Sequence, residues 1–467
     1  MIGLAAMGLL GCAIQVPDGR FACDPQNGCP SGYSCIAGRC RSGEPSDGSV
    51  DVGSDARSVD AGLDAREPDA YAVDANSLDA RSLDASVVDA GSDAGSDAFT
   101  TDVGTDAGTC NPASCPWGCA GASCDRPLQV STTDIHTCMV TTGHRLWCWG
   151  ANENWELGTT VASPVVRPIR ISSITDAVEV RTGSSGTCVR LLSGAVRCTG
   201  NDDAGQIGNG LPLSPVSRFT DTTPVLSTTA LGSGYLTYCA VDVDSSVWCW
   251  GSDFYTDQVP VPTHVMREPA SDGVLLTGAV EVACEVVACC ARLDAAHGGA
   301  VACWGNNDGH GLGDGTTIRR TGAVLALGVT NATALFSGDY QHFAIAGDAV
   351  YEWGAHRPPP SDVGARVGTI ALANGDSHTC FLLATRRVVC LGNDNTHGQV
   401  GVGSTSVVTT PTDVGLADVV SMTSAWYHSC AITGAGLLYC WGANNQGQIG
   451  NGDALLADVH APVLITP

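Results

Sequence analysis

One unit of about 50 residues recurs from residue 130 to the end of the chain, and this repeat constrains the fold more than any other feature. In its clearest copy, residues 427–452, a cysteine starts a short apolar strand, a glycine turn leads to a second strand, and that strand ends in Cys440-Trp441-Gly442 before a Gly-Gln-Ile-Gly turn. A fixed period of this length indicates a repeat architecture in which neighbouring units share a core. The second-strand cysteines mark the period: Cys148, Cys198, Cys249, Cys303, Cys390 and Cys440.

Seven copies can be counted, because a degenerate copy at 341–354 fills the long step between Cys303 and Cys390. The strands are short and rich in β-branched residues, and turn glycines permit positive φ. Short strands, regular turns and this period predict an all-β fold of four-stranded blades arranged radially. A tryptophan–glycine pair, or a variant of it, ends the second strand of each copy: Trp149-Gly150, Thr199-Gly200, Trp250-Gly251, Trp304-Gly305, Trp353-Gly354, Leu391-Gly392 and Trp441-Gly442.

The pattern His-x-Cys…Cys-Trp-Gly-x-Asn…Gly-Gln-x-Gly-x-Gly resembles the repeats of the regulator of chromosome condensation family. The resemblance covers about residues 125–467, is weaker in the third copy and is partial in the fifth. It implies a seven-bladed β-propeller over 125–467. From the spacing we also expect Leu128–Val130 to supply a strand to the last blade, which would remove an open sheet edge.

The paired cysteines of the repeat predict disulfides. First- and second-strand cysteines are ten residues apart in five copies and thirteen apart in the fourth, while copy five replaces both with Phe343 and Glu352. Loss as a pair favours a cross-strand disulfide in each other blade, and 23 cysteines indicate an oxidising compartment. Structural zinc is the alternative, but the chain has no Cys-x-x-Cys pair. The predicted disulfides are Cys138–Cys148, Cys188–Cys198, Cys239–Cys249, Cys290–Cys303, Cys380–Cys390, Cys430–Cys440 and Cys284–Cys289.

The chain before the repeats divides into segments of different composition. Residues 1–12 end in Leu-Leu-Gly-Cys, which resembles a lipoprotein signal peptide with lipid attachment at Cys12; an ordinary buried segment is the alternative. The basic start of such a peptide is missing, so we expect the true start upstream of Met1. Residues 13–43 and 109–124 each hold four cysteines and are predicted to be small cross-linked segments.

Residues 44–108 are rich in Asp and Ala. Fourteen Asp and two Glu against three Arg give a net charge of −13, half of the −26 of the whole chain. Such a composition predicts a disordered, extended linker. Calcium binding is the alternative, but Asp-Ala pairs four to five residues apart lack the spacing of two and the glycine turn of calcium loops.

The charge and composition exclude several function classes. A net charge of −26 argues against a nucleic-acid partner, which needs clustered positive charge. The 22 basic residues are all arginine. Without lysine, the chain has no Walker lysine, kinase lysine, Ser-x-x-Lys system or Schiff base.

Three histidines, His136, His378 and His428, each lie two residues before the first cysteine of a copy. A ring of metal-binding imidazoles is conceivable, but we expect a structural role, since copies two to four have other residues there: Gly186, Thr237 and Ala288. The turn 306–315 resembles a calcium loop without its terminal glutamate. Asp202-Asp203 and other scattered acids are not brought together by any motif. We therefore expect no catalytic, cofactor-binding or metal-binding residues.

Three loops that diverge from the repeat are the predicted binding elements, because aromatic and arginine side chains dominate binding hot spots. They lie at 154–155, 235–262 and 356–360, and loop drift without a partner is the alternative. The candidate residues are Trp155, Phe254, Tyr255, His356 and Arg357.

The sequence thus predicts a non-catalytic, monomeric lipoprotein of the outer membrane or cell surface, secreted if the anchor is absent, that binds protein partners. Nucleotide exchange, the activity of the family's eukaryotic founder, is not expected, because no exchange-specific insertion can be matched. One secreted bacterial branch inhibits β-lactamases, so inhibition of a secreted enzyme is the second hypothesis. A polysaccharide-cleaving propeller is the third; clustered carboxylates on one face would favour it, and an aromatic face would favour binding.

Overall fold

The computed structural model describes residues 33–36, 39–42, 110–211, 213–252, 258–355, 357–362 and 368–467. The chain divides into two compact units, Met1–Phe99 and Thr100–Pro467. In the first, strands β1 (Tyr33–Ile36) and β2 (Arg39–Ser42) pair antiparallel. The predicted signal peptide with its Cys12 and the linker 44–108 lie outside the described residues. Within the described ranges, no helix is long and apolar enough to cross a membrane.

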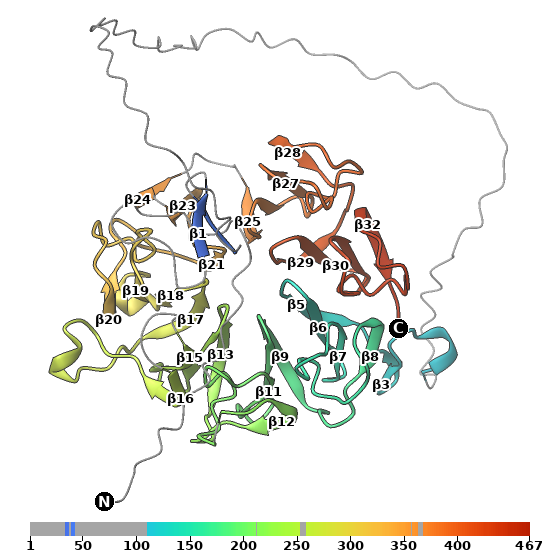
Figure 1. Cartoon of the computed structure of the whole chain (residues 1–467), viewed down its shortest axis with the longest axis horizontal. Coiled ribbons are helices and arrows are strands. Elements are labelled where there is room, and N and C mark those ends of the chain that lie inside the picture. The colour runs from blue at the N-terminus through green and yellow to red at the C-terminus, as the bar shows by residue number, and fades with distance from the viewer. Residues whose placement is uncertain are drawn as a thin grey trace, which may run out of the picture. The chain divides into compact units, whose positions relative to one another are not determined.

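Seven four-stranded antiparallel sheets surround a central channel in the second unit (Figure 1). In every sheet the strand beside the channel comes first in the sequence and the outermost strand comes last. This arrangement confirms the predicted all-β, seven-bladed propeller.

The strands take equivalent places in all blades. The innermost strands are β5 (Pro127–Thr132), β9 (Ala177–Gly183), β13 (Thr228–Ser233), β17 (Ala279–Cys284), β21 (Ala334–Gly338), β25 (Thr369–Asn374) and β29 (Val419–Ser424). The second strands are β6 (His136–Thr141), β10 (Gly186–Leu191), β14 (Thr237–Asp242), β18 (Ala288–Leu293), β22 (Gln341–Ala346), β26 (His378–Leu383) and β30 (His428–Thr433). The third strands are β7 (Leu146–Gly150), β11 (Val196–Gly200), β15 (Val247–Ser252), β19 (Val301–Gly305), β23 (Ala349–Gly354), β27 (Val388–Gly392) and β31 (Leu438–Gly442). The outermost strands are β8 (Val165–Arg170), β12 (Val216–Asp221), β16 (Gln258–His264), β20 (Arg320–Leu325), β24 (Arg357–Asp362), β28 (Val408–Asp413) and β32 (Val459–Ile465). Outside the sheets lie η1 (Pro112–Ser114), β3 (Cys119–Ala120), β4 (Ser123–Cys124), η2 (Ala270–Asp272) and η3 (Ala295–His297).

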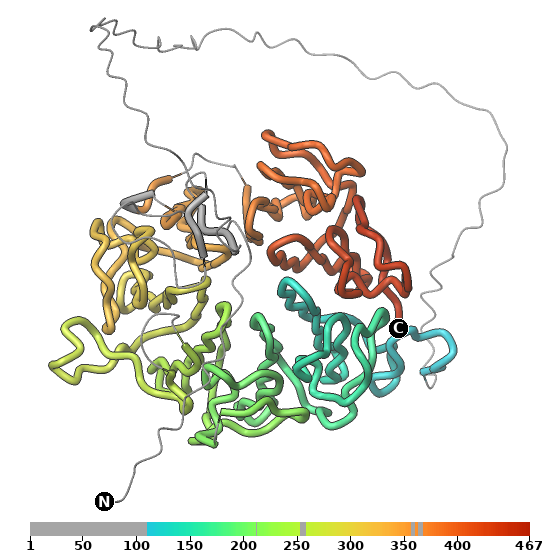
Figure 2. The backbone as a smooth tube through the Cα atoms, in the orientation of Figure 1, coloured from blue at the N-terminus to red at the C-terminus, as the bar shows by residue number. Residues whose placement is uncertain are grey.

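The ring closes without exchanging a strand between the first and last blades. β5, which contains Leu128–Val130, pairs with β6 of the first blade, so our prediction that it joins the last blade is wrong. The last blade already has four strands, because β32 pairs with β31 and supplies its outermost strand. The two blades instead meet side by side, with β5 next to β29 and β30 (Figure 2).

The signature residues of the repeat join each blade to the next. Four of the signature tryptophans are fully buried, and in three of them the indole N–H donates to the main-chain carbonyl of a glutamine in the loop of the preceding blade. The first of these bonds links the first and last blades, so it takes part in ring closure. The bonds are Trp149 to Gln448 (2.9 Å), Trp250 to Gln206 (2.9 Å) and Trp441 to Gln399 (3.0 Å).

The glycine two residues after each of these glutamines lies against the indole ring. Gly450 has a φ of +80°, and a Cβ at this position would lie 2.5 Å from Trp149 Nε1. Blade two lacks the tryptophan and has Thr199 in its place. There Phe219, from the outer strand β12, occupies the space against Gly158 instead. A residue from another strand thus compensates for the missing signature side chain.

Disulfides join the second and third strands in every blade except the fifth. The bonded cysteines are directly opposite in register, as Cys138 and Cys148 are, and most are fully buried. In blade five, Phe343 lies opposite Glu352 at the same place. The pairs that join second and third strands are those expected from the spacing: Cys138–Cys148, Cys188–Cys198, Cys239–Cys249, Cys290–Cys303, Cys380–Cys390 and Cys430–Cys440. The two remaining cysteines of blade four, Cys284 and Cys289, are bonded as predicted and join β17 to β18.

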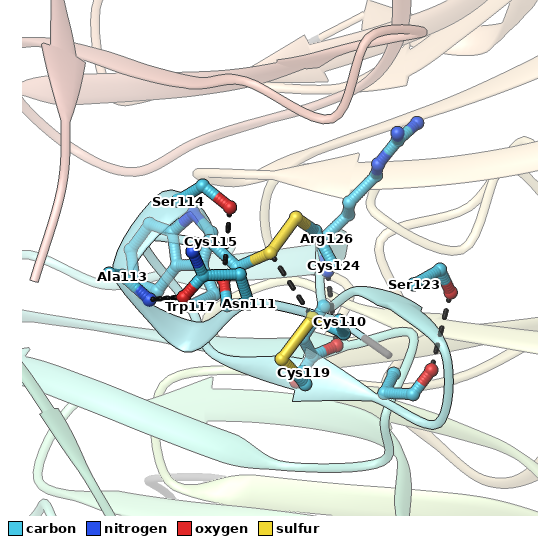
Figure 3. Close-up of a disulfide and its surroundings, with 12 residues drawn as sticks. Cys110, Asn111, Ala113, Ser114, Cys115, Trp117, Cys119, Ser123, Cys124 and Arg126 are labelled. Atoms are coloured by element: carbon cyan, nitrogen blue, oxygen red, sulfur yellow. Dashed lines mark hydrogen bonds between the residues drawn. A yellow bond between two sulfur atoms is a disulfide. The ribbon is translucent and has the colours of Figure 1, made fainter. Parts of the chain in front are cut away.

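The segment 110–126 packs on the first blade and carries two further disulfides, Cys110–Cys119 and Cys115–Cys124 (Figure 3). Trp117 is buried, and its ring meets Trp147 edge-on with the centroids 5.3 Å apart. The buried Asp125 carboxylate accepts from Arg145 at 3.0 Å and from Gly143 N at 2.6 Å. These contacts make the segment part of the propeller unit.

Proline interrupts the outermost strand of five blades, at Pro168, Pro260 and Pro262, Pro358–Pro360, Pro411 and Pro462. Because proline has no N–H to donate, it blocks the pairing of exposed strand edges with other chains. The outermost strands of blades two and four, β12 and β20, have no such proline. In blade four, the edge strand β20 forms a parallel bridge between Ala323 and Arg267 of the connection from blade three.

Candidate functional site

The turns between the first and second strands of all blades meet at one end of the central channel. They surround a cavity of about 260 Å³. We call this end the channel mouth and define it by seven turn residues, one from each blade in order: Asp134, Ser184, Tyr235, Glu285, Asp339, Asp376 and Trp426. Apart from Asp376, all of them line the cavity.

Two aromatic rings stack across the channel mouth. Tyr235 comes from blade three and Trp426 from blade seven, and their ring centroids are 5.6 Å apart with 22° between the planes. Trp426 also meets Tyr427 edge-on, at 6.4 Å. Tyr235 and Trp426 are only partly buried, so the stack presents aromatic surface to solvent.

Acidic groups from blades four to six lie beside this stack. Burial raises the pKa of Asp339 to about 9, and a hydrogen bond with Asp376 and the charges of Asp376, Glu285 and Asp134 act in the same direction. Its Oδ1 is buried and has no hydrogen-bond partner within the described part of the chain. Near neutral pH, Asp339 therefore keeps a proton while the exposed Asp376 carboxyl faces solvent at the rim.

Glu285 is 5% exposed, and burial raises its pKa to about 8 although four backbone N–H groups act against the shift. One of these bonds, from Val287 N to Glu285 Oε2, is 3.1 Å long. Its Oε1 lies near Gly311, at the place where other repeats carry the loop glutamine. Glu285 therefore fills the space of the missing glutamine side chain.

Hydroxyl groups line the channel below the mouth and link neighbouring blades. Ser131 Oγ lies 2.9 Å from Thr182 Oγ1, and Thr132 Oγ1 lies 3.1 Å from Thr423 Oγ1 of the last blade. Because these hydroxyls are paired with each other, they fix the inner strands and leave the turn residues as the chemically distinctive part of the site.

Asp376 contributes directly to the raised pKa of the Asp339 carboxyl, so these two acids are neighbours at the channel mouth. Among the described residues, the groups of three that could hold a metal ion consist of cysteines, and all of these are in disulfides.

The blade histidines bond to the neighbouring blade. His136 Nε2 lies 2.9 Å from Thr187 Oγ1, and His378 Nε2 lies 2.8 Å from Ser429 Oγ. His428 Nε2 lies 3.1 Å from Thr137 Oγ1 and so joins the last blade to the first. Burial lowers the pKa of all three histidines, to about 3, about 4 and about 3 respectively. The structural interpretation of these residues agrees with this geometry.

In two of the copies that lack this histidine, the second and the fourth, the next blade carries a larger partner. Blade two has Gly186, and Tyr238 of blade three, which is fully buried, lies against Gly183 and Gly186. Blade four has Ala288, and the following blade carries the buried His342, which stacks on Trp353. The pairs keep the interblade volume filled although single positions look irregular in the sequence.

Of the five predicted binding residues, the structure describes the side chain of Trp155 alone, and it lies away from the channel mouth. Trp155 is 36% exposed and has a φ of +64°, and its carbonyl accepts from Thr199 Oγ1 of blade two. It does not line the cavity. Phe254, Tyr255 and His356 lie outside the described residues, as does the side chain of Arg357.

Sequence reasoning missed most of the channel mouth, although a positional signal exists. Six of its seven residues lie four positions before the residue at the first-cysteine position of their copy, and Glu285 lies five before Cys290. The residue type changes from blade to blade at this position, so it is lost when the copies are compared only for what they share.

The comparisons with known proteins agree with this architecture. The last repeat matches the regulator of chromosome condensation (RCC1) repeat model at residues 419–448 and 435–467. Protein pim1 of Schizosaccharomyces pombe is 27% identical over 205 residues, which are 36% of this chain and 38% of pim1. The ultraviolet-B receptor UVR8 of Arabidopsis thaliana is 24% identical over 366 residues, 70% of this chain and 79% of the receptor. The chain spans less than half of the length of pim1.

The solved structure of Prp20p from Saccharomyces cerevisiae has the same fold. Its TM-score is 0.60 at 18% sequence identity, and the match covers 70% of this chain and 87% of that one. A second structure, yeast RCC1 (Prp20) with Kap60, gives a TM-score of 0.59 at 18% identity and covers 70% and 84% of the two chains. The last repeat of this chain thus matches the regulator of chromosome condensation (RCC1) repeat, and the propeller has the fold of Prp20p.

Proposed function

We propose that this protein is a non-catalytic binding module whose propeller holds a partner protein at the channel mouth. The observation that carries the proposal is the partly exposed Tyr235–Trp426 stack beside a set of acidic groups. Aromatic side chains at the rim of a cavity are typical energetic centres of protein interfaces. The likeness to Prp20p concerns the fold alone, so its described binding to Gsp1p and histones is not carried over.

The chemistry of the channel mouth favours a cationic segment of the partner. Asp134 and Asp376 offer carboxylates at the rim, and the aromatic faces of Tyr235 and Trp426 attract arginine or lysine through cation–π contact. An arginine is favoured, because its planar guanidinium can stack on an indole while it donates to a carboxylate.

We further propose that the protein is an extracytoplasmic lipoprotein, attached through Cys12 and extended from the membrane by the acidic linker 44–108. The many disulfides of the propeller unit support an oxidising compartment. Cys12→Ala should abolish incorporation of a radiolabelled fatty acid, whereas the control variant Cys40→Ser should still incorporate it. Equal labelling of both variants would contradict the anchor.

Inhibition of a secreted enzyme is a special case of the same proposal, in which the partner's active site receives the channel mouth. A polysaccharide-acting enzyme is the third hypothesis, and the aromatic stack at the channel mouth favours binding over it.

The experiment is a capture of surface and secreted proteins of the source cells on the oxidised full-length chain. Three baits should be compared: the natural chain, Tyr235→Ala/Trp426→Ala, and Trp155→Ala. We expect one strongly enriched protein with the first and third baits and its loss with the double variant. If the double variant retains the protein while Trp155→Ala loses it, the binding surface is the blade-one loop and our proposal for the channel mouth is wrong.

A further inference from the structure

Blade four departs from the repeat at two places. Its connection from blade three, residues 265–278, is fourteen residues long, whereas the connection between β8 and β9 has six, 171–176. Its β18–β19 hairpin is also longer, since Cys290 and Cys303 are thirteen residues apart, whereas the cysteines of the equivalent hairpins in five other blades are ten apart. The other blades complete their sheets without these two insertions, so ring closure does not explain the structure that the insertions form.

The two insertions meet in space and enclose a pocket. Gly278 O, at the end of the long connection, accepts from Asp294 N of the long hairpin at 2.8 Å, and the His297 ring of η3 lies against Gly278. On the other side, the connection lies along β20, where Ala323 N donates to Met266 O at 2.7 Å. Between these contacts lies a cavity of about 530 Å³, which is in the size range of small-molecule sites.

The floor and wall of this pocket are apolar. Leu276 and Leu293 come from the connection and from β18, and Ala302 and Ala323 come from β19 and β20. All four belong to one hydrophobic cluster and are buried. An apolar ligand body would therefore gain free energy by leaving water here.

The charged side chains of the pocket leave one guanidinium available. Arg320 is neutralised by Asp314, at 3.3 Å, and by Glu268, at 3.9 Å. Arg267 lines the pocket and is exposed, and it makes no ion pair with any described residue. In a chain with a net charge of −26, an unpaired arginine beside an apolar cavity is suited to an anionic group.

We propose that this blade-four pocket binds a small amphipathic carboxylate, with the apolar body on the Leu276–Leu293 floor and the carboxylate paired with Arg267. The site is separate from the channel mouth, so the proposal does not depend on the proposed partner binding. A planar carboxylate suits the guanidinium fork, because it can accept two parallel N–H bonds.

The test is isothermal titration calorimetry of the oxidised full-length chain with three probes: sodium decanoate, sodium acetate and decyltrimethylammonium bromide. The two decyl compounds are used below their critical micelle concentrations. We expect saturable binding of one decanoate, and binding weaker by about tenfold or more for each of the other two, since one lacks the body and the other the anion. No saturable binding of decanoate, or equal binding of the cation, would overturn the proposal.

Variants then assign the binding to this pocket. Arg267→Ala should weaken decanoate about tenfold or more, and Ala300→Leu, which adds a side chain inside the pocket, should abolish binding. Arg218→Ala is the matched control, because Arg218 is an exposed arginine on the outer strand of blade two. An equal loss with Arg218→Ala would show nonspecific charge attraction and would refute the pocket. Arg267 is on the surface, so its variant keeps the test valid even if Ala300→Leu does not fold.

Discussion

A single loop glycine gives a quantitative test of how the propeller ring is held together. Gly450 follows the Gly-Gln loop of the last blade and has a φ of +80°. An added Cβ would lie 2.5 Å from Nε1 and 2.7 Å from Cδ1 of Trp149 in the first blade. Gly450→Ala therefore perturbs the interface that closes the ring, and it removes no side chain.

Three costs determine the expected magnitude. Alanine in the left-handed region costs about 1–2 kcal/mol. The indole must move away from the new methyl group, and overpacking of this kind costs about 1–3 kcal/mol. Moving the ring breaks the 2.9 Å bond to Gln448 O and leaves a buried N–H unpaired, which costs about 1–3 kcal/mol. Since movement of the ring relieves part of the clash, we expect a total loss of about 3–6 kcal/mol in the free energy of unfolding.

The measurement is urea denaturation of the oxidised protein followed by tryptophan fluorescence and circular dichroism. Gly403→Ala is the matched control, because Gly403 has a φ of +77° and nothing lies within 4 Å of its added Cβ. It should lose only the backbone cost of about 1–2 kcal/mol. Equal losses for the two variants would show that the indole contact contributes nothing, and the account of ring closure through Trp149 would be refuted.

Other perturbations test the interior and its charges. The stability of the Asp339→Asn variant should depend less on pH than that of the natural protein. In the natural folded protein this carboxyl, with its pKa raised to about 9, keeps a proton that the unfolded chain releases above the ordinary pKa of 3.8. The natural protein should therefore lose stability relative to this variant as pH rises from 5 to 8 in thermal melts, and parallel curves would contradict the shift. The double variant Cys188→Ala/Cys198→Ala should lose about 2–3 kcal/mol in the free energy of unfolding, measured by urea denaturation. No change would mean that the disulfide does not constrain the unfolded chain. Gly186→His and Tyr238→Thr should each lower the stability of the protein, whereas the double variant should recover much of that loss. Strictly additive losses would refute the idea that Tyr238 fills the space left by Gly186.

The fold could be predicted from the sequence because the repeated residues have local roles. The Trp-Gly pair or its variant lies at the end of the third strand of every blade, so counting these pairs counts the blades, and at three junctions the tryptophan also bonds to a Gly-Gln turn. Ring closure could not be predicted in the same way. The stretch Leu128–Val130 has the same pattern whether it pairs with β6 or with the last blade, and the choice depends on β32, which fills the place that the prediction left open.

The candidate sites could not be predicted, for a related physical reason. Residues that recur in several copies hold the ring together: signature indoles, loop glutamines and blade histidines form hydrogen bonds between neighbouring blades. What is left for binding are positions where the blades differ, because a ring of identical turns has no preferred orientation for an asymmetric partner. Such positions lie in the turns that carry Tyr235 and Trp426 and in the two insertions of blade four. In a propeller of this kind, the departures from the repeat are therefore the places to test for function, and the repeat itself accounts for the scaffold.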